Sequence, residues 1–259
     1  MAGIRSPRQY CRKEKREWGR KSLPCCREFP HTWMKTLIRP VYSHWELQQV
    51  HDVEQAVWQA HTTPISLLRV FADHGGLILG AYNESERMVG MSAAFAARYQ
   101  GLWYLHSHMM AVLPSYRLRG IGRELKQYQV NWALQNGYDF VGWTFDPLQK
   151  ANAHFNLTIF KAHVLAFLPN YYGSLHDTIN HESPTHRFFV GFSPQWPSCR
   201  ISRARELVPL PEDISRLREK EPAEALKWAQ YYAARFTRES FSVLGLAFSP
   251  GRRLCYIVG

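Results

Sequence analysis

The sequence predicts a mixed α/β (α+β) fold, because strand-like and helical patterns follow one another along most of the chain. A length of 259 residues with 46% hydrophobic residues supports one large domain, or one domain with an elaboration. The clearest segment is 103–136, where an apolar strand, a basic glycine-bearing turn and an amphipathic helix follow in order. We expect the rest of the chain to be arranged around this unit.

A strand and two helices are expected first. The strand lies near Lys35 to Tyr42, and a capping box at Ser43 to Glu46 opens a helix with apolar positions from Leu47 to Ala60. Thr63-Pro64 is typical of a second helix start, and Gly75 of its end. These signals predict two helices in quick succession.

Strands then dominate, with one long helix between them. Glycine and polar turns separate the expected strands Leu77 to Tyr82, Met88 to Arg98 and Trp103 to Leu113. The helix from Ile121, with apolar positions Leu125, Tyr128 and Trp132, ends at Asn136-Gly137. Asp146-Pro147 is expected to cap a further helix that reaches about Ala162. The other expected strands are Phe140 to Phe145, Val164 to Leu168 and Arg187 to Phe192.

The chain beyond the main domain, which we place at 34–195, changes in composition. A Pro- and Arg-rich connector follows Pro194, and a helix begins near Pro222. A hairpin of Ser240 to Phe248 and Leu254 to Val258 is expected to close the chain. Because this segment, 196–259, has little apolar mass, we expect it to pack on the main domain or on a second subunit.

The net charge of +11 is concentrated at the start of the chain, where residues 1 to 40 hold eleven Lys or Arg against three acids. Residues 1–33 lack a core pattern, so we predict a disordered basic extension, with a nucleic-acid or membrane-surface tether as the alternative. Met34 also opens a natural first strand. No run of eighteen apolar residues, secretory signal or cysteine framework occurs, which favours a cytoplasmic protein without a membrane partner.

The turn from Arg117 to Gly122 has the features of an anion-binding loop. Glycines at a helix start let a ligand approach the backbone, and the unpaired N–H groups and dipole there favour phosphate. Arg117 and Arg119 add donors suited to a pyrophosphate or a 3′-phosphate. A dinucleotide fingerprint is excluded because Leu125 stands where a third glycine is needed, and no GxxxxGK[ST] occurs.

The motif R-x-x-G-x-G in this context, within AVLPSYRLRGIGRELKQ, resembles the acyl-CoA loop of the GNAT superfamily of N-acetyltransferases. The resemblance covers roughly Met34 to Ser193, and within the superfamily this stretch is similar to one uncharacterised bacterial branch of predicted acetyltransferases. It implies a mostly antiparallel central sheet flanked by helices, with the last helix and hairpin as a C-terminal extension. It also implies acyl transfer to an amine from acetyl-CoA or another acyl-CoA, without a metal.

The resemblance also implies where acyl-CoA binds. A backbone N–H at the end of the strand before the loop would meet the acyl carbonyl, and the loop N–H groups would meet the pyrophosphate. Asn152 would lie near the pantetheine arm. The residues implied are Met110, Ala111, Val112, Leu113, Arg117, Leu118, Arg119, Gly120, Ile121, Gly122, Arg123 and Asn152.

Two histidines are candidates for the general base. His106 and His108 alternate on one strand face with Tyr104, and an imidazole pKa near 6.5 suits proton removal at neutral pH. We favour His108 because it lies nearer Met110. A structural role for either histidine stays open, as does a metal site completed by Asp146 or His154.

The acid that protonates the leaving thiolate is less clear. Many relatives carry a tyrosine where this chain has Leu157, and Lys161 replaces the glycine that usually ends that helix. Tyr171 and Tyr172 are the substitutes that remain, and loop aromatics also pack or bind substrate. Trp103, Trp143 and Tyr171 are candidate pocket walls.

Two functions are therefore compatible with the sequence. The first is an acyl-CoA-dependent N-acyltransferase that acts on a small-molecule amine or a protein amine through a ternary complex. The alternative is a non-catalytic acyl-CoA-binding or structural module of the same fold. Assembly into a homo-oligomer is compatible with either function, and nucleic acid is not an expected partner.

Overall fold

The computed structural model of the protein describes residues 36–59, 62–173, 175, 183–197, 206–237 and 241–259. The basic extension expected at 1–33 lies outside these residues. Within them no helix is both long and apolar enough to cross a membrane.

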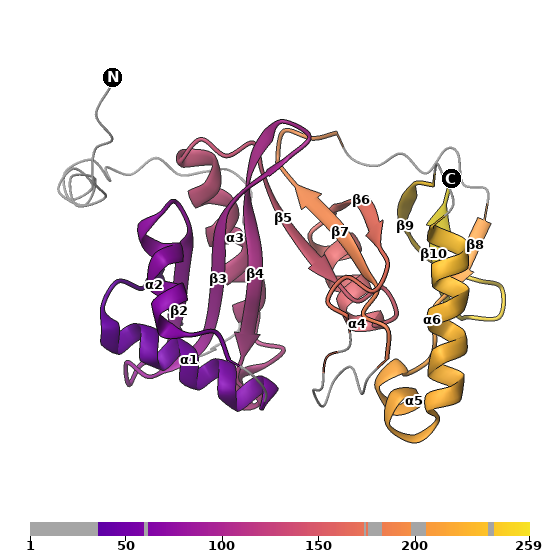
Figure 1. Ribbon diagram of the computed structural model, residues 1–259, viewed down its shortest axis with the longest axis horizontal. Coiled ribbons are helices and arrows are strands. Elements are labelled where there is room, and N and C mark those ends of the chain that lie inside the picture. Colours follow the sequence, from indigo (N-terminus) through magenta and orange to yellow (C-terminus); the bar gives the residue numbers. More distant parts are fainter. Residues whose placement is uncertain (1–35, 60–61, 174, 176–182, 198–205, 238–240) are drawn as a thin grey trace, which may run out of the picture. The chain divides into compact units, whose positions relative to one another are not determined.

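A seven-stranded sheet forms the centre of the fold, in the order β1-β2-β3-β4-β5-β7-β6 (Figure 1). Every pair of neighbours is antiparallel except β4 and β5, which are parallel. The mixed, mostly antiparallel sheet expected from the sequence is thus confirmed. The strands are β1 (Leu37–Pro40), β2 (Leu77–Tyr82), β3 (Met88–Tyr99), β4 (Leu102–Val112), β5 (Phe140–Phe145), β6 (His163–Leu168) and β7 (Arg187–Phe192).

Two cores hold the helices against this sheet. Helices α1 (His44–Trp58) and α2 (Ile65–Asp73) pack with β2 and β3, and their core includes Leu47 and Leu68. Helix α3 (Ile121–Gln135) packs through Ile121 and Leu125 into a separate and larger core. The sheet therefore has an α1–α2 face and an α3 face.

The start of α1 is capped as the sequence predicts, whereas the start of α2 is not. Ser43 and Glu46 form the expected capping box at α1. At α2 the N-cap is Pro64, without a side-chain hydrogen bond. Thr63 instead donates its backbone N–H, at 2.8 Å, and its hydroxyl, at 3.0 Å, to Glu54 Oε1. Thr63 therefore holds the segment between the two helices.

Strand β4 contains a bulge at His108. Ala93 pairs with Met109 and Ala94 pairs with Ser107, so His108 is the extra residue with no partner on β3. Before the bulge Leu105 packs into the core on the α3 face, whereas after it Met110 does so. The bulge therefore exchanges the faces to which odd- and even-numbered side chains of β4 point.

Strands β4 and β5 pair over a short distance only. Their pairs are Tyr104 with Phe140, Leu105 with Val141, and His106 with Gly142. Beyond these positions β4 continues to Val112 and β5 to Phe145 without pairing with each other. The two strands diverge there (Figure 1), which opens the middle of the sheet.

The segment after β5 differs from the expected helix. Asp146 does not cap a helix, because its Oδ1 accepts from Leu148 N at 2.9 Å in a tight turn. Helix α4 is only Lys150–Ala153, and a π-helical turn, η3 (His154–Ile159), replaces its continuation. The expected helical segment is therefore present from Lys150 to Ile159, but its expected cap at Asp146 is wrong and its second half is π-helical.

The C-terminal region forms a three-stranded sheet with two helices. The sheet has the order β8-β10-β9, made of β8 (Glu206–Pro209), β9 (Val243–Phe248) and β10 (Leu254–Val258). Helix α6 (Pro222–Phe236) and the β9–β10 hairpin confirm two expected elements. Strand β8 and helix α5 (Ile214–Lys220) fall where the sequence suggested only a connector, which is a correction.

Contacts join this region to the rest of the described chain. The Phe236 ring lies 5.0 Å from that of Phe188 on β7. The Tyr256 hydroxyl donates to the carbonyl of Pro147 at 2.6 Å. Both contacts are buried, so the small sheet and its helices share the core on the α3 face.

Candidate active site

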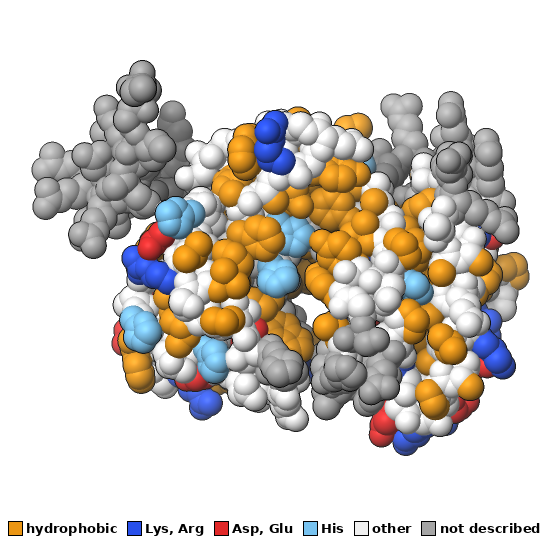
Figure 2. All heavy atoms as spheres, viewed as in Figure 1, with side chains coloured by type: hydrophobic (Ala, Val, Ile, Leu, Met, Phe, Trp, Pro, Cys, Tyr) orange, Lys and Arg blue, Asp and Glu red, His pale blue; other side chains and the backbone are white. Residues whose placement is uncertain are grey.

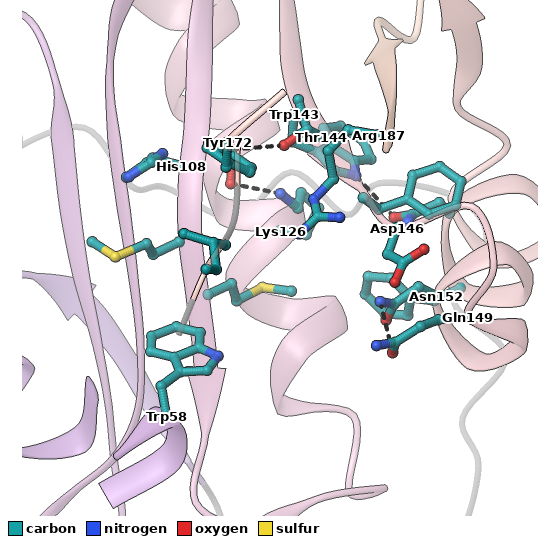
Figure 3. Close-up of a pocket in the computed structure, with 17 residues that line it drawn as sticks. Trp58, His108, Lys126, Trp143, Thr144, Asp146, Gln149, Asn152, Tyr172 and Arg187 are labelled. Carbon is teal, nitrogen blue, oxygen red and sulfur yellow. Dashed lines mark hydrogen bonds between the residues drawn. The ribbon is translucent and has the colours of Figure 1, made fainter. Parts of the chain in front are cut away.

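A cavity of about 520 Å³ lies where β4 and β5 diverge. It reaches both faces of the sheet, since Trp58 on α1 and Lys126 on α3 both line it. Figure 2 shows histidine and hydrophobic side chains around a hollow on one face, and Figure 3 shows the lining. The lining residues are Trp58, Ser107, His108, Met109, Met110, Lys126, Trp143, Thr144, Phe145, Asp146, Gln149, Asn152, Phe155, Asn156, Tyr172, Leu175 and Arg187.

His108 projects into this cavity from the β4 bulge. Its side chain is exposed, with its ring 5.8 Å from that of Phe95 and 6.1 Å from that of His106. Partial desolvation lowers the pKa of His108 below its ordinary value, which favours the neutral imidazole. A neutral imidazole at the edge of a cavity can accept a proton.

His106 occupies a different environment. It is only 6% exposed, does not line the cavity, and its Nδ1 lies 3.2 Å from the hydroxyl of Tyr104. Burial, with smaller effects from His108 and Lys126, lowers the pKa of His106 to about 4. His106 is therefore packed within an aromatic cluster, while His108 meets the cavity.

The two candidate tyrosines are also separated. Tyr172 lines the cavity, and its hydroxyl shares a hydrogen bond of 3.0 Å with Thr144 Oγ1. Tyr171 is 49% exposed and is not part of the lining. Of the expected pocket walls, Trp143 lines the cavity. Trp103 is 51% exposed, and the guanidinium carbon of Arg98 lies 5.3 Å from the centre of its ring. Trp103 and Tyr171 are thus not walls of this cavity.

Lys126 is a cavity residue that sequence reasoning missed. It is 2% exposed, and its Nζ donates to Ser107 Oγ at 2.6 Å and lies 4.2 Å from the centre of the Trp143 ring. Desolvation lowers the pKa of Lys126 to about 7. A signal existed, since Lys126 stands four residues before the buried Val130 and therefore on an apolar face of α3.

The other charged groups of the lining have partners of their own. Asp146 Oδ2 lies 2.7 Å from Arg218 Nη1 on α5, and both side chains are buried. Arg187 donates from Nη1 to the carbonyl of His186 at 2.9 Å and lies 5.3 Å from the Tyr172 ring centre. The lining therefore carries more positive than negative charge.

The expected phosphate loop forms the start of α3, outside the cavity lining. Gly120 is the N-cap with φ 86°, a left-handed conformation that favours glycine. The first N–H of the helix with a backbone acceptor is that of Glu124, at 3.0 Å from Gly120 O. Within the described residues, the N–H groups of 118–123 make no backbone–backbone hydrogen bond of good geometry, so these six donors face a ligand at a positive helix end.

The loop and the cavity are adjoining. A Cβ on Gly122 would lie 3.7 Å from Met110 Cε, and Met110 lines the cavity. Asn152 also lines it, and donates to Gln149 Oε1 at 3.3 Å. Ala111, Val112 and Leu113 lie further along β4 and its end and are not in the lining.

The two departures from the family pattern have structural counterparts. Leu157 packs against the core on the α3 face from within η3. Lys161 has φ 53°, the left-handed conformation that glycine adopts most easily. Among the described residues no three His, Cys, Asp or Glu side chains gather as metal ligands would, and Asp146 is engaged by Arg218.

Comparisons with known proteins bear on the fold and on the family. Residues 37–156 match the family model described as the acetyltransferase (GNAT) family. A structure of the NatC complex bound to Gag peptide and CoA matches with a TM-score of 0.50 and 14% identity, over 62% of this chain and 99% of that chain. No curated protein sequence matches the chain.

A second structural match is the ribosomal-protein-S18-alanine N-acetyltransferase from Escherichia coli, with a TM-score of 0.50 and 13% identity over 63% of this chain and 96% of that chain. At such identities the likeness is one of fold. Family model and fold together support N-acetyltransferase activity. Residues 37–156 therefore resemble the GNAT family in sequence, and the chain resembles N-acetyltransferases in fold.

Proposed function

We propose that the protein transfers an acyl group from acyl-CoA, with acetyl-CoA as the first candidate, directly to an amine. The observation that carries this proposal is the adjoining pair of sites, in which six free N–H groups at the start of α3 lead past Met110 into the β4–β5 cavity. The first site suits phosphates, and the second is open to both faces of the sheet, as a two-substrate reaction requires.

The residues present fit the phosphate end of CoA. Beyond the free N–H groups, Gly120 has open space around its Cα, since a Cβ added there would meet no atom within 4 Å. Arg117 and Arg119 are exposed and lie beside it in the chain. Backbone donors and guanidinium groups together bind a pyrophosphate well.

We assign proton removal from the amine to His108. The reaction forms a C–N bond, breaks the C–S bond and releases a thiolate, so one proton must leave the ammonium and one must reach the sulfur. His108 Nδ1 or Nε2 would accept the first proton directly or through one water. The Tyr172 hydroxyl, on the same cavity, is our candidate for delivery of the second. The β4 backbone near Met110, which has no pairing partner on β5, would orient the carbonyl.

The acceptor is an amine of a small molecule or of a protein. One matching structure contains a peptide, and the name of the other specifies a protein alanine. Peptides with free N-termini therefore belong in the test beside small amines.

The experiment is a thiol-release assay with acetyl-CoA against a panel of peptides and small amines, with mass spectrometry of the products. The proposal expects a product heavier by one acyl group with at least one acceptor. If calorimetry detects CoA binding but the whole panel is inert, the non-catalytic acyl-CoA-binding module becomes the better description. If CoA does not bind at all, the phosphate loop is wrongly assigned.

A further inference from the structure

Lys126 is a buried lysine for which the described residues offer no counter-ion. An ammonium has three donors, and one is used by Ser107 Oγ at 2.6 Å. The Trp143 ring, 4.2 Å away, covers another side. No carboxylate in the described part of the chain lies within ion-pair distance of Lys126, and the acid of the lining, Asp146, already pairs with Arg218 at 2.7 Å.

A buried, unpaired ammonium costs several kcal/mol unless an anion joins it. The protein keeps this charge at the wall of the cavity in which the reaction is proposed to occur, at 2% exposure. Figure 3 shows Lys126 among the cavity side chains. A ligand that enters the cavity with an anionic group could therefore supply the partner that Lys126 lacks.

The contacts around Lys126 limit the chemical class of the anionic group that would bind it. The phosphates of CoA have their own donors at 118–123, outside the lining. A ligand cation in direct contact with Lys126 would be repelled, so the group that binds at Lys126 itself is an anion. The anionic group that acyl chains and amine substrates commonly carry is a carboxylate, which also suits the amide donors of Asn152 and Gln149 in the same lining.

We propose that Lys126 binds a carboxylate carried by one of the two substrates. This proposal rests on the proposed acyl transfer. The carboxylate has two sources, the end of a dicarboxylic acyl chain or a carboxylate on the amine acceptor. Gly122 and Lys126 stand one helical turn apart on the same face of α3, so a ligand held at the phosphate loop can extend past Met110 toward Lys126.

Titration of the site supports this assignment. Desolvation lowers the pKa of Lys126 to about 7, and a bound carboxylate would raise it again. Above pH 7, binding should therefore take up a proton at Lys126. The other charged or titratable groups that face this region are His106, His108, Tyr172, Arg187 and the Asp146–Arg218 pair.

The test compares matched ligands that differ only in the carboxylate. The first arm uses succinyl-CoA against butyryl-CoA with a neutral amine. The second uses acetyl-CoA with an amino acid against the corresponding amino-acid amide. Binding is measured by calorimetry in buffers of different ionisation enthalpy, and turnover by thiol release. We expect the wild type to prefer the carboxylate by about tenfold to a hundredfold in one arm, as charged hydrogen bonds of about 1.5–3 kcal/mol give.

Lys126→Met should abolish that preference and the proton uptake. Lys150→Met is the matched control, since Lys150 pairs with Glu212 at 2.9 Å and does not line the cavity, so it should keep the preference. The arm that shows the preference identifies the source of the carboxylate.

The inference is overturned if the wild type binds both members of each pair equally, or if Lys126→Met keeps the preference. Either result can occur in a protein that turns over acetyl-CoA, which would leave the proposed function intact. Absence of turnover together with a retained carboxylate preference in binding would instead count against the proposed reaction alone.

Discussion

Asp146 and Arg218 form a buried ion pair, with 2.7 Å between Oδ2 and Nη1, that connects the turn after β5 to helix α5. Asp146 also lines the cavity and fixes the turn by accepting from Leu148 N at 2.9 Å. A residue of the C-terminal region thus neutralises the acid of the lining and holds its place. The C-terminal region is in this way coupled to the site.

Arg218→Met should destabilise the protein by about 3–5 kcal/mol, because it leaves Asp146 buried without a counter-charge. The loss would be read from urea unfolding followed by circular dichroism. The double variant Asp146→Asn with Arg218→Met should recover part of the stability, since the unpaired charge is gone. Equal stability of Arg218→Met and the wild type would mean that the pair contributes nothing.

His108→Gln should reduce turnover by about a hundredfold or more, while CoA affinity stays near that of the wild type. An essential neutral histidine makes activity fall as pH drops through its pKa, and desolvation places this limb below pH 6.5. The limb should vanish with His108. His106→Gln is the control and should cost less, because His106 does not line the cavity. Wild-type turnover and an unchanged limb in both variants would exclude a histidine base.

Gly120→Glu should abolish CoA binding, because it places a negative charge at the phosphate loop. Gly137→Glu is a matched control, since both glycines have positive φ, 86° and 80°, and no atom within 4 Å of an added Cβ. The strain of the substitution is therefore alike at the two ends of α3. Calorimetry with CoA measures the effect, and equal affinity in the two folded variants would refute the phosphate assignment.

Lys126→Met should raise the melting temperature at pH 7 and below, because it removes a buried ammonium. The folded-state pKa is about 7 against an ordinary value of 10.5, so between these values the unfolded state binds the extra proton. Wild-type stability therefore gains about 1.4 kcal/mol per pH unit in this window relative to the variant. Melting curves from pH 6 to 10 should show the difference in melting temperature between the variant and the wild type shrinking as pH rises. A difference that stays constant would contradict the lowered pKa of Lys126.

The sequence predicted the large sheet well because its strands and turns carry local signals. Polar and glycine turns separate Leu77 to Tyr82 from Met88 to Arg98, and the ends of these two strands differ from the structure by one residue at most, whereas the first strand is two residues shorter at each end than expected. The capping box at Ser43 was equally readable, since the box is a local hydrogen-bond pattern. Such features depend on residues close together in the chain.

The features that the sequence did not predict depend on partners far apart in the chain. Asp146 before Pro147 has the composition of a helix cap, but Arg218 and the turn to Leu148 use its carboxylate instead. Strand β8 is short and takes its place from pairing with β10, for which a four-residue segment carries little periodicity. Lys126 is missed because a buried lysine is rare in general, and its burial depends on contacts with other elements of the fold.

Because of the bulge at His108, the arrangement of the site depends on the number of residues in β4. A chain shortened by this one residue could keep all its helices and turns, yet the side chains from Met109 to Val112 would each point to the opposite layer. Met110 would leave the α3 face, and the connection from the helix start to the cavity would lose its wall. Engineering of this strand therefore tolerates exchanges of residue more readily than a change in their number.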